Sequence, residues 1–393
     1  MTTPSVATDM TAPPVVIELK PSARPLPDAE RTALMTDPGF GRHFTDHMVT
    51  VRWTEGRGWH DGQLVPFAPL TLSPAAMALH YAQTIFEGLK AYRQPDGALA
   101  VFRPERNARR FRESARRLAM PELPEETFVA ALDALVAQDA VWVPEGRETS
   151  LYLRPFLFAT ETGLGIRPAR EYLFMVIASP SGSYFPDGVR PLSVWISEDH
   201  VRAAPGDTGA AKCGGNYAAS LVAQAQAAER GCDQVVWLDA TERRWVEEMG
   251  GMNLYFVHGD RIVTPMLSGS LLPGITRHSL LRVAADLGHA AVESRVSVHD
   301  WRRDCAAGRV TEVFACGTAA VVTPVGSVRS VRGDWTVGDG RPGPLTMRLR
   351  EALLDIQTGR APDRHGWMHR ITNSAPSPSA ASSARTTQGA DIV

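Results

Sequence analysis

Short apolar runs and longer amphipathic stretches follow one another along the first half of the chain. Runs rich in aliphatic and aromatic residues and bounded by turn-forming residues are typical of strands. Such runs occur at residues 99–102, 150–160, 171–180 and 191–197. Residues 105–118 and 125–143 lack this short-run pattern, and their spacing of apolar positions predicts a helix in each.

The second half follows residues 184–193, where Pro, Asp and Gly stand close together and predict a domain boundary. We expect a helix at residues 216–230, closed by Gly231. The remaining predicted elements are a strand at 233–239, a hairpin at 252–265 that turns at 258–260, and a helix within 274–288 that starts at Thr276. Helices and strands do not alternate strictly, so the fold class is α+β (mixed α/β).

The length of 393 residues indicates about two domains between two atypical ends. Residues 1–35 are rich in Pro, Thr and Ala and predict an extended arm. Residues 372–393 contain a Ser/Ala/Pro-rich segment of low complexity, for which we expect disorder. Between them we predict a smaller domain at 36–186, a linker at 187–200 and a larger domain at 201–371.

Composition argues against several classes of protein. The formal net charge is −2, so no overall positive field favours nucleic acid, and the Arg-dense segment 103–118 is interpreted mainly as a solvated helix face. No apolar run is long enough to span a membrane, and the first twenty residues lack a secretory signal pattern. The four cysteines show no CxxC spacing. We therefore expect a cytoplasmic protein that binds no nucleic acid or membrane and has neither a disulfide framework nor a metal site.

Lysine is rare in this chain, and one lysine stands in an unusual setting. The sequence holds three lysines (Lys20, Lys90 and Lys212) beside 38 arginines. A lysine amine can lose its proton and act as a nucleophile, whereas a guanidinium cannot. Lys212 lies among small residues in "TGAAKCGGNYAAS", and its position before the glycines excludes a P-loop. This setting favours a lysine that condenses with the aldehyde of pyridoxal phosphate.

A pyridoxal phosphate site also needs an acid for the ring nitrogen and an anion site for the phosphate. "VEEMGGMN" supplies Glu247 and Glu248, one of which we expect to lie in a solvated turn. "LLPGITRHS" places Gly274, Ile275 and Thr276 at a helix start, where anions are favoured, although most such starts are merely capped. "FACGTAAVV" adds a possible donor pair, Gly317 and Thr318, which alone is only a turn.

Nine blocks in one order, between about residues 38 and 370, resemble the branched-chain-amino-acid aminotransferases of fold type IV. The resemblance implies a smaller N-terminal α/β domain and a larger C-terminal domain with a mixed, β-barrel-like core, with the active site between them. The blocks are "FTDHMVTVRW", "ALHYAQTIFEGLKAYR", "FRPERNARRFRESA", "SLYLRPFLFATETGLG", "ASPSGSYF", "TGAAKCGGNYAASL", "EEMGGMNLYFV", "LLPGITR" and "FACGTAAVVTPVG".

The resemblance also implies roles around the cofactor, pyridoxal 5'-phosphate. Lys212 corresponds to the lysine that forms the internal aldimine and carries the proton between the substrate Cα and the cofactor C4′. Tyr217 corresponds to the residue at the phenolic oxygen, Glu248 rather than Glu247 to the acid at the pyridine nitrogen, and Arg110 to a phosphate ligand. Ile275, Thr276, Gly317 and Thr318 are expected to complete the phosphate cradle.

For the substrate, the resemblance implies an apolar wall and a site for carboxylates. Tyr152 and Arg154 correspond to residues at the carboxylate site, and the period of two along a strand puts them on one face. Taken alone, Tyr152 is better interpreted as a buried aromatic residue. Lys90 lies in a family block but is assigned no chemistry. The predicted substrate contacts are Phe40, Tyr81, Phe86, Tyr152, Arg154, Tyr184, Thr318 and Ala319.

At two places the sequence differs from that of some relatives, and each difference changes what we expect of the site. The stretch after the Gly317–Thr318 pair contains no cysteine, so the CxxC redox switch of some relatives is not expected. Gly251 stands where some relatives have threonine, which removes one possible hydroxyl contact and lets the backbone approach closely.

The implied reaction is a ping-pong transamination of Leu, Ile or Val with 2-oxoglutarate, giving 2-oxo acids and glutamate. A homodimer whose sites borrow residues from the partner is expected. Alternatives within the fold are a D-amino-acid aminotransferase, an aminodeoxychorismate lyase and a transaminase of specialised metabolism. A binding protein without the cofactor is an alternative of another class, which Lys212, Glu248 and Arg110 argue against.

Overall fold

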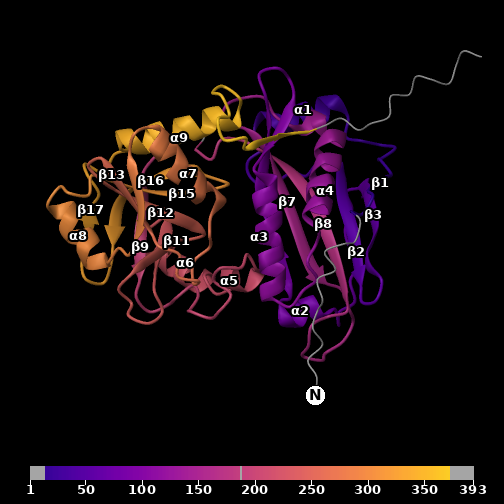
Figure 1. The fold of residues 1–393 in the computed structure, drawn as a ribbon, viewed down its shortest axis with the longest axis horizontal. Coiled ribbons are helices and arrows are strands. Elements are labelled where there is room, and N and C mark those ends of the chain that lie inside the picture. Colours follow the sequence, from indigo (N-terminus) through magenta and orange to yellow (C-terminus); the bar gives the residue numbers. More distant parts are fainter. Residues whose placement is uncertain (1–13, 186–187, 372–393) are drawn as a thin grey trace, which may run out of the picture.

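The computed structural model describes residues 14–185 and 188–371. These residues form two bodies side by side, each built on a nine-stranded sheet (Figure 1). The predicted tail at 372–393 and the first part of the predicted arm lie outside the described residues. The mixed α/β fold class is confirmed.

The first body is a mainly antiparallel sheet with two helices packed on it. Its strands run in the order β1-β3-β2-β8-β7-β5-β6-β18, and β4 pairs with β7. The strands are β1 (Glu18–Leu19), β2 (His47–Thr54), β3 (Gly58–Pro66), β4 (Thr84–Phe86), β5 (Leu89–Arg93), β6 (Leu99–Phe102), β7 (Ser150–Ala159), β8 (Glu171–Ser181) and β18 (Met368–Arg370). The helices are α1 (Asp28–Thr36), α2 (Met77–Tyr81), α3 (Pro104–Arg117) and α4 (Glu125–Gln138), followed by a 3₁₀ turn at Ala140–Trp142.

Helices α3 and α4 lie against this sheet through aromatic side chains. The Phe111 ring on α3 is 5.4 Å from Phe128 on α4 and 5.6 Å from Phe174 on β8. All three side chains are almost completely buried. Such aromatic contacts contribute about 0.5–1.5 kcal/mol beyond area burial. This packing holds α3 at the border with the second body (Figure 1).

The second body contains a closed ring of strands. Its order is β11-β10-β9-β16-β15-β12-β13-β14, and β11 also pairs with β12, which joins the first six of these strands into a barrel. The strands are β9 (Leu192–Ser197), β10 (Gln234–Leu238), β11 (Val246–Met249), β12 (Met252–His258), β13 (Arg261–Pro265), β14 (Ala290–Ser294), β15 (Glu312–Gly317), β16 (Val321–Arg329) and β17 (Trp335–Thr336). The helices are α5 (Gly214–Ala218), α6 (Leu221–Glu229), α7 (Ile275–Asp286), α8 (Val298–Ala306) and α9 (Pro344–Gln357). The predicted barrel-like core is confirmed.

Strand alternation divides the second body into two apolar clusters. Along β12, Leu254 and Phe256 join one buried cluster, while Tyr255 and Val257 join another that includes residues of α7 and α9. Successive side chains of a strand point to opposite faces, so one strand supports both clusters.

Three predictions differ from the structure. Residues 192–197 of the predicted linker form β9, a strand inside the second sheet, because their apolar side chains are buried on both faces. Residues 368–370, assigned to the larger domain, form β18 and pair with β6 of the first sheet. Residues 18–19 and 28–36 of the predicted arm form β1 and α1.

The helix predicted at 216–230 is two helices, α5 and α6. The Tyr217 carbonyl accepts hydrogen bonds from both the backbone N–H and the side-chain hydroxyl of Ser220. This local bonding competes with a continuous helix ladder. Gly231 does end the second helix, with a φ of +66°.

Candidate active site

Lys212 lies directly before α5, where the chain of the second body touches the first. Its backbone N–H donates to Ser114 Oγ on α3 at 3.0 Å, and its carbonyl accepts from the Phe86 N–H at 3.0 Å. The next residue, Cys213, pairs with Ile85 of β4 in an isolated bridge. The backbone on both sides of the Lys212 side chain is therefore held by the first body.

Two aromatic rings flank the Lys212 amine. Lys212 Nζ donates to Tyr217 Oη at 2.8 Å and lies 4.9 Å from the centre of the Phe86 ring. The two rings are 4.9 Å apart. Since the Lys212 side chain is only partly buried, its amine is accessible to a molecule that enters between the two bodies. The structure thus brings together three of the predicted site residues.

Glycines allow this close approach. A Cβ on Gly214 would lie 3.1 Å from the side chain of Thr84, a tighter distance than most real contacts. At Gly251, the departure noted in the sequence, a Cβ would lie 3.6 Å from the Tyr217 ring. The backbone of the β11–β12 turn therefore runs beside the tyrosine that contacts Lys212.

Glu248 is a buried acid with one oxygen left without a hydrogen-bond donor. Its Oε1 accepts from the Leu272 N–H at 2.8 Å and from Asn253 Nδ2 at 3.1 Å. Arg202 Nε lies 2.9 Å from Oε2, but the angle is not that of a hydrogen bond, and Oε2 has no hydrogen-bond partner among the described residues. Burial raises the pKa of Glu248, and the Arg202 charge and the Leu272 N–H oppose this rise.

The neighbouring acid, Glu247, has different partners. Consecutive side chains of β11 point to opposite faces, and Glu247 Oε1 accepts hydrogen bonds from Ser268 and Ser270. The serine hydroxyls satisfy this oxygen locally. Of the two acids, Glu248 is the one with an unused buried acceptor.

Arg202 was not identified from the sequence. Its side chain is 8% exposed, and its guanidinium also donates to the carbonyls of Ser270 (2.9 Å) and Gly209 (3.1 Å). A Cβ on Gly209 would come within 2.6 Å of the Ser270 backbone, so only glycine fits there. The sequence reasoning could have looked for such a residue, because a buried acid such as Glu248 needs a cation nearby.

Arg110 and Glu87 form a buried ion pair on the first body. Arg110 Nε and Nη2 donate to the two Glu87 oxygens at 2.7 and 2.8 Å, and Asn107 Nδ2 adds a bond of 2.8 Å. Burial would raise the pKa of Glu87, but the Arg110 charge holds it below its usual value. Glu87 is a second residue that the sequence reasoning missed, although it lies in the block "IFEGLKAY".

The same arginine reaches the start of α7. Arg110 Nη1 donates to the Pro273 carbonyl at 3.2 Å, directly before Gly274, Ile275 and Thr276. The free N–H groups at a helix start favour an anion, and a guanidinium adds to that preference. The predicted cation and the predicted helix start therefore meet between the two bodies.

We expect Glu87→Gln to lower the free energy of unfolding by about 3–5 kcal/mol, because it leaves the Arg110 charge buried without its partner. Denaturant unfolding at a fixed cofactor concentration measures this change. Glu18→Gln is the matched control, since Glu18 pairs with Lys20 at the surface, where an ion pair is worth less than about 1 kcal/mol. Equal effects of the two substitutions would contradict this account of the buried pair.

The Gly317–Thr318 pair lies in the turn between β15 and β16, which faces the first body. Thr318 Oγ1 donates to the Gly88 carbonyl at 3.1 Å, and Lys90 Nζ donates to the Ala319 carbonyl at 2.8 Å. This turn therefore contacts the same segment that carries Phe86 and Glu87.

Four predicted substrate residues form one connected group. Arg154 Nη2 donates to Tyr152 Oη at 3.0 Å, and the Arg154 guanidinium lies 4.8 Å from the Phe86 ring centre. The Phe40 ring contacts Tyr152 edge-on at 4.9 Å. Since Phe86 also flanks Lys212, this group adjoins the amine.

Tyr81 and Tyr184 lie apart from that group. Tyr81 Oη donates to the Leu164 carbonyl at 2.5 Å, in a surface hollow that Ile166 also lines. The Tyr184 ring packs on Phe185 at 4.9 Å. Neither tyrosine makes a ring contact or hydrogen bond with Phe86, Lys212 or Tyr217 within the described parts of the chain. Their place in the substrate wall therefore stays a prediction.

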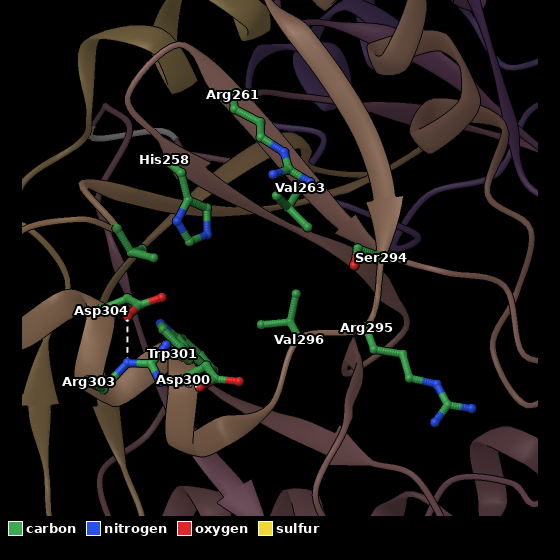
Figure 2. A pocket seen from close by; sticks show the side chains of 11 residues that line it. His258, Arg261, Val263, Ser294, Arg295, Val296, Asp300, Trp301, Arg303 and Asp304 are labelled. Carbon is green, nitrogen blue, oxygen red and sulfur yellow. Dashed lines mark hydrogen bonds and ion pairs between the residues drawn. The ribbon is translucent and has the colours of Figure 1, made fainter.

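A separate pocket of about 260 Å³ lies in the second body, between the β12–β13 hairpin, the end of β14 and α8 (Figure 2). His258, Arg261 and Asp304 line it, and Asp304 Oδ1 accepts a hydrogen bond from Arg303 Nε at 2.9 Å. None of the predicted site residues lines this pocket.

Comparisons with known proteins identify the family of this chain. The family described as amino-transferase class IV matches residues 84–328, a span that includes Arg110, Lys212, Glu248 and Thr318. The chain belongs to the class IV aminotransferases.

Within this aminotransferase family, two similar curated relatives are named as branched-chain enzymes. It is 68% identical over 363 residues to a "Probable branched-chain-amino-acid aminotransferase" of Streptomyces coelicolor, covering 92% of this chain and 100% of the relative. The "Branched-chain-amino-acid aminotransferase" of Mycolicibacterium smegmatis is 58% identical over 367 residues, covering 92% and 100%. The chain thus belongs to the family of branched-chain-amino-acid aminotransferases, as the resemblance implied.

Solved structures of the same aminotransferases share the fold. The Escherichia coli branched-chain amino acid aminotransferase has a TM-score of 0.68 at 29% identity, covering 82% of this chain and 99% of that one. The T.th. branched-chain amino acid aminotransferase with pyridoxamine 5'-phosphate has a TM-score of 0.67 at 31% identity, covering 82% and 98%. The fold type IV prediction is confirmed. In the described part of the chain, no helix combines the length and hydrophobicity of a membrane span.

Proposed function

We propose that this aminotransferase uses pyridoxal 5'-phosphate to transfer the amino group of Leu, Ile or Val to 2-oxoglutarate, in ping-pong order. The observation that carries the proposal is the placement of Lys212, Tyr217 and Glu248. An accessible amine bonds to a phenol at 2.8 Å, and a nearby buried acid has a free acceptor oxygen. Burial raises the pKa of Glu248, and the Lys212 charge is among the effects that oppose this rise.

The residues present fit the cofactor. A pyridinium N–H would satisfy Glu248 Oε2, which otherwise is buried without a donor. Tyr217 would hold the phenolic oxygen. Arg110 and the N–H groups at the start of α7 would hold the phosphate, together with the Gly317–Thr318 turn.

When bound, the cofactor supplies an electron sink for the charge that develops at the amino-acid Cα. The chain then has to hold and move one proton. Lys212, once its amine is free and neutral, would take the proton from the substrate Cα and deliver it to the cofactor C4′. Phe86 and Tyr217 restrict where that amine can point. Burial raises the pKa of Glu248 and Arg202 opposes this rise, because an opposite charge close by favours the charged form.

The predicted substrate residues suit both the amino donor and the acceptor, 2-oxoglutarate. Phe40 and Phe86 offer apolar surface to an aliphatic side chain. Arg154, positioned by Tyr152 and stacked on Phe86, offers a fixed guanidinium to the second carboxylate of 2-oxoglutarate. One group can thus serve an apolar donor and an acidic acceptor in turn.

We also propose a homodimer. Large apolar side chains are exposed close to Tyr81: Leu79 is 62%, Leu164 65% and Ile166 89% exposed. A cluster of this kind on a folded chain marks an interaction surface. A second copy covering this face would also explain why Tyr81 lies apart from its own Lys212 cluster. Molar mass in solution, measured by light scattering, tests this.

An amino-donor panel with 2-oxoglutarate as acceptor tests the reaction itself. We expect kcat/KM for L-Leu, L-Ile and L-Val to agree within about 10-fold and to exceed that of Ala by at least about 10-fold, since each buried methylene contributes about 1–3 kcal/mol of discrimination. D-Leu and aromatic donors are the controls. A preference for D-amino acids, or glutamate formation only from aromatic donors, would contradict the proposal.

A further inference from the structure

Lys90 is a buried lysine that the proposed chemistry does not use. Its side chain lies on β5 at 6% residue exposure, and its amine donates to the Ala319 carbonyl of the second body at 2.8 Å. It is one of three lysines in a chain that otherwise carries arginine. A buried cation that makes a single bond across a body boundary needs a reason, because an apolar side chain of similar size is often as stable.

The carbonyl that Lys90 binds belongs to a strained turn. The turn runs from Gly317 to Val321 between β15 and β16, and Val321 has a φ of +62°. A β-branched residue in this left-handed region is a genuine outlier. Such a conformation persists only where the surroundings hold it, and it occurs preferentially at ligand clamps.

Two hydrogen bonds from the first body hold this turn. Lys90 Nζ binds the Ala319 carbonyl, and the Gly88 carbonyl accepts from Thr318 Oγ1 at 3.1 Å. A Cβ on Gly88 would collide with Tyr152 Oη, so the hydroxyl of the proposed carboxylate site lies against the same backbone. The turn and Tyr152 therefore both contact the segment from Gly88 to Lys90.

We propose that Lys90 is a positioning residue, whose amine holds the Gly317–Val321 turn in the shape that receives the substrate carboxylate. This rests on the proposed function and on the prediction from the sequence that Thr318 and Ala319 contact substrate. Lys90 itself does not touch substrate. It fixes the peptide after Ala319 from the side of the first body.

The surroundings of Lys90 suit a compact ammonium. The pKa of Lys90 is lowered to about 8, chiefly by burial and also by the nearby Arg350 on α9, while the Glu148 charge opposes the fall. Arg350 and Glu148 pair with each other at 2.9 Å, so Glu148 is already engaged. At pH 7 the amine stays mostly protonated and donates a charge-assisted bond. An ammonium places a compact charge there, whereas a guanidinium is a planar fork.

Carboxylate binding to the holoenzyme tests the proposal without turnover. The ligand is 4-methylvalerate, an aliphatic carboxylate with no amino group, followed through the absorbance of the bound cofactor. We expect Lys90→Met to bind it about 10-fold more weakly, the effect of losing one charge-assisted hydrogen bond. Cofactor content and absorbance should not change. Lys20→Met, which removes an exposed lysine, should bind as the wild type does.

Two further readouts separate positioning from general stability. In Lys90→Met, the KM for both Leu and 2-oxoglutarate should rise about 10-fold while kcat changes less than about 3-fold. Hydrogen exchange should quicken at residues 318–320 and stay unchanged in α4. Unchanged carboxylate affinity and exchange in a folded Lys90→Met holoenzyme would overturn the proposal.

Failure of the two proposals can be told apart. A wild type that does not transaminate, but whose carboxylate binding depends on Lys90, overturns the proposed function and keeps the role of Lys90. Normal transamination that is insensitive to Lys90→Met overturns the role of Lys90 alone. If Lys90→Met gives no folded holoenzyme, Lys90→Gln is measured instead, with the same expected losses.

Discussion

Lys212→Ala is expected to lower kcat/KM with Leu by at least about 10⁴-fold, because it removes the group that both binds the cofactor covalently and moves the proton. Lys212→Arg should be equally inactive, since a guanidinium cannot form that covalent bond or lose its proton at neutral pH. Steady-state rates with 2-oxoglutarate give the fold-change. Borohydride treatment of the holoenzyme, followed by peptide mass spectrometry, should place the cofactor on the peptide that contains Lys212.

Lys20→Ala is the control for this experiment. Lys20 is exposed and pairs with Glu18, so its removal should change neither rate nor labelling. Cofactor found on Lys90 or Lys20 in the wild type, or an active Lys212→Ala enzyme, would show that Lys212 has been assigned the wrong role.

Glu248→Gln should have the second largest effect, a fall in kcat of about 10²–10³-fold. The substitution keeps the size of the side chain and removes the negative charge that would hold a proton on the ring nitrogen. Preorganised charges of this kind, in sites shielded from water, are typically worth that factor. It also leaves Arg202, 2.9 Å away, without its counter-charge, so the unfolding midpoint should fall as well.

Glu247→Gln provides a matched control from the adjacent position. Its side chain bonds to Ser268 and Ser270, and we expect kcat to change by less than about 10-fold. Rates and the cofactor spectrum of the two variants are compared at one pH. If Glu247→Gln were the more damaging of the two, the assignment of the ring acid would be reversed.

Many residues of the candidate site could be predicted from the sequence, because the chemistry of the site depends on residue types that stand in local blocks. Lys212 stood out since an amine has reactions that a guanidinium lacks. The choice between Glu247 and Glu248 came only from the resemblance, while the contrast in their partners became visible when β11 was placed against Asn253 and Leu272. Strand alternation predicted Tyr152 and Arg154 on one face, and their side chains do contact each other.

Contacts across the border between the bodies could not be derived from local pattern. Lys90 and Ala319 are 229 residues apart, and Arg110 and Pro273 are 163 apart. No periodicity links such pairs. The pairs Arg202–Glu248 and Glu87–Arg110 each lie within one body, but no local pattern links them either, so Arg202 and Glu87 were missed. Tyr81 and Tyr184 were grouped with the wall, yet their observed contacts are elsewhere.

The sequence by itself predicted several of the helices and strands, and which side chains can do the chemistry, because hydrophobic spacing and functional groups are local properties. Only the tertiary structure decided that β9 enters the sheet, that β11 closes on β12, and that Val321 is held with a positive φ. Those outcomes depend on burial and hydrogen bonds between distant segments, whose free energies arise only once both partners are in place.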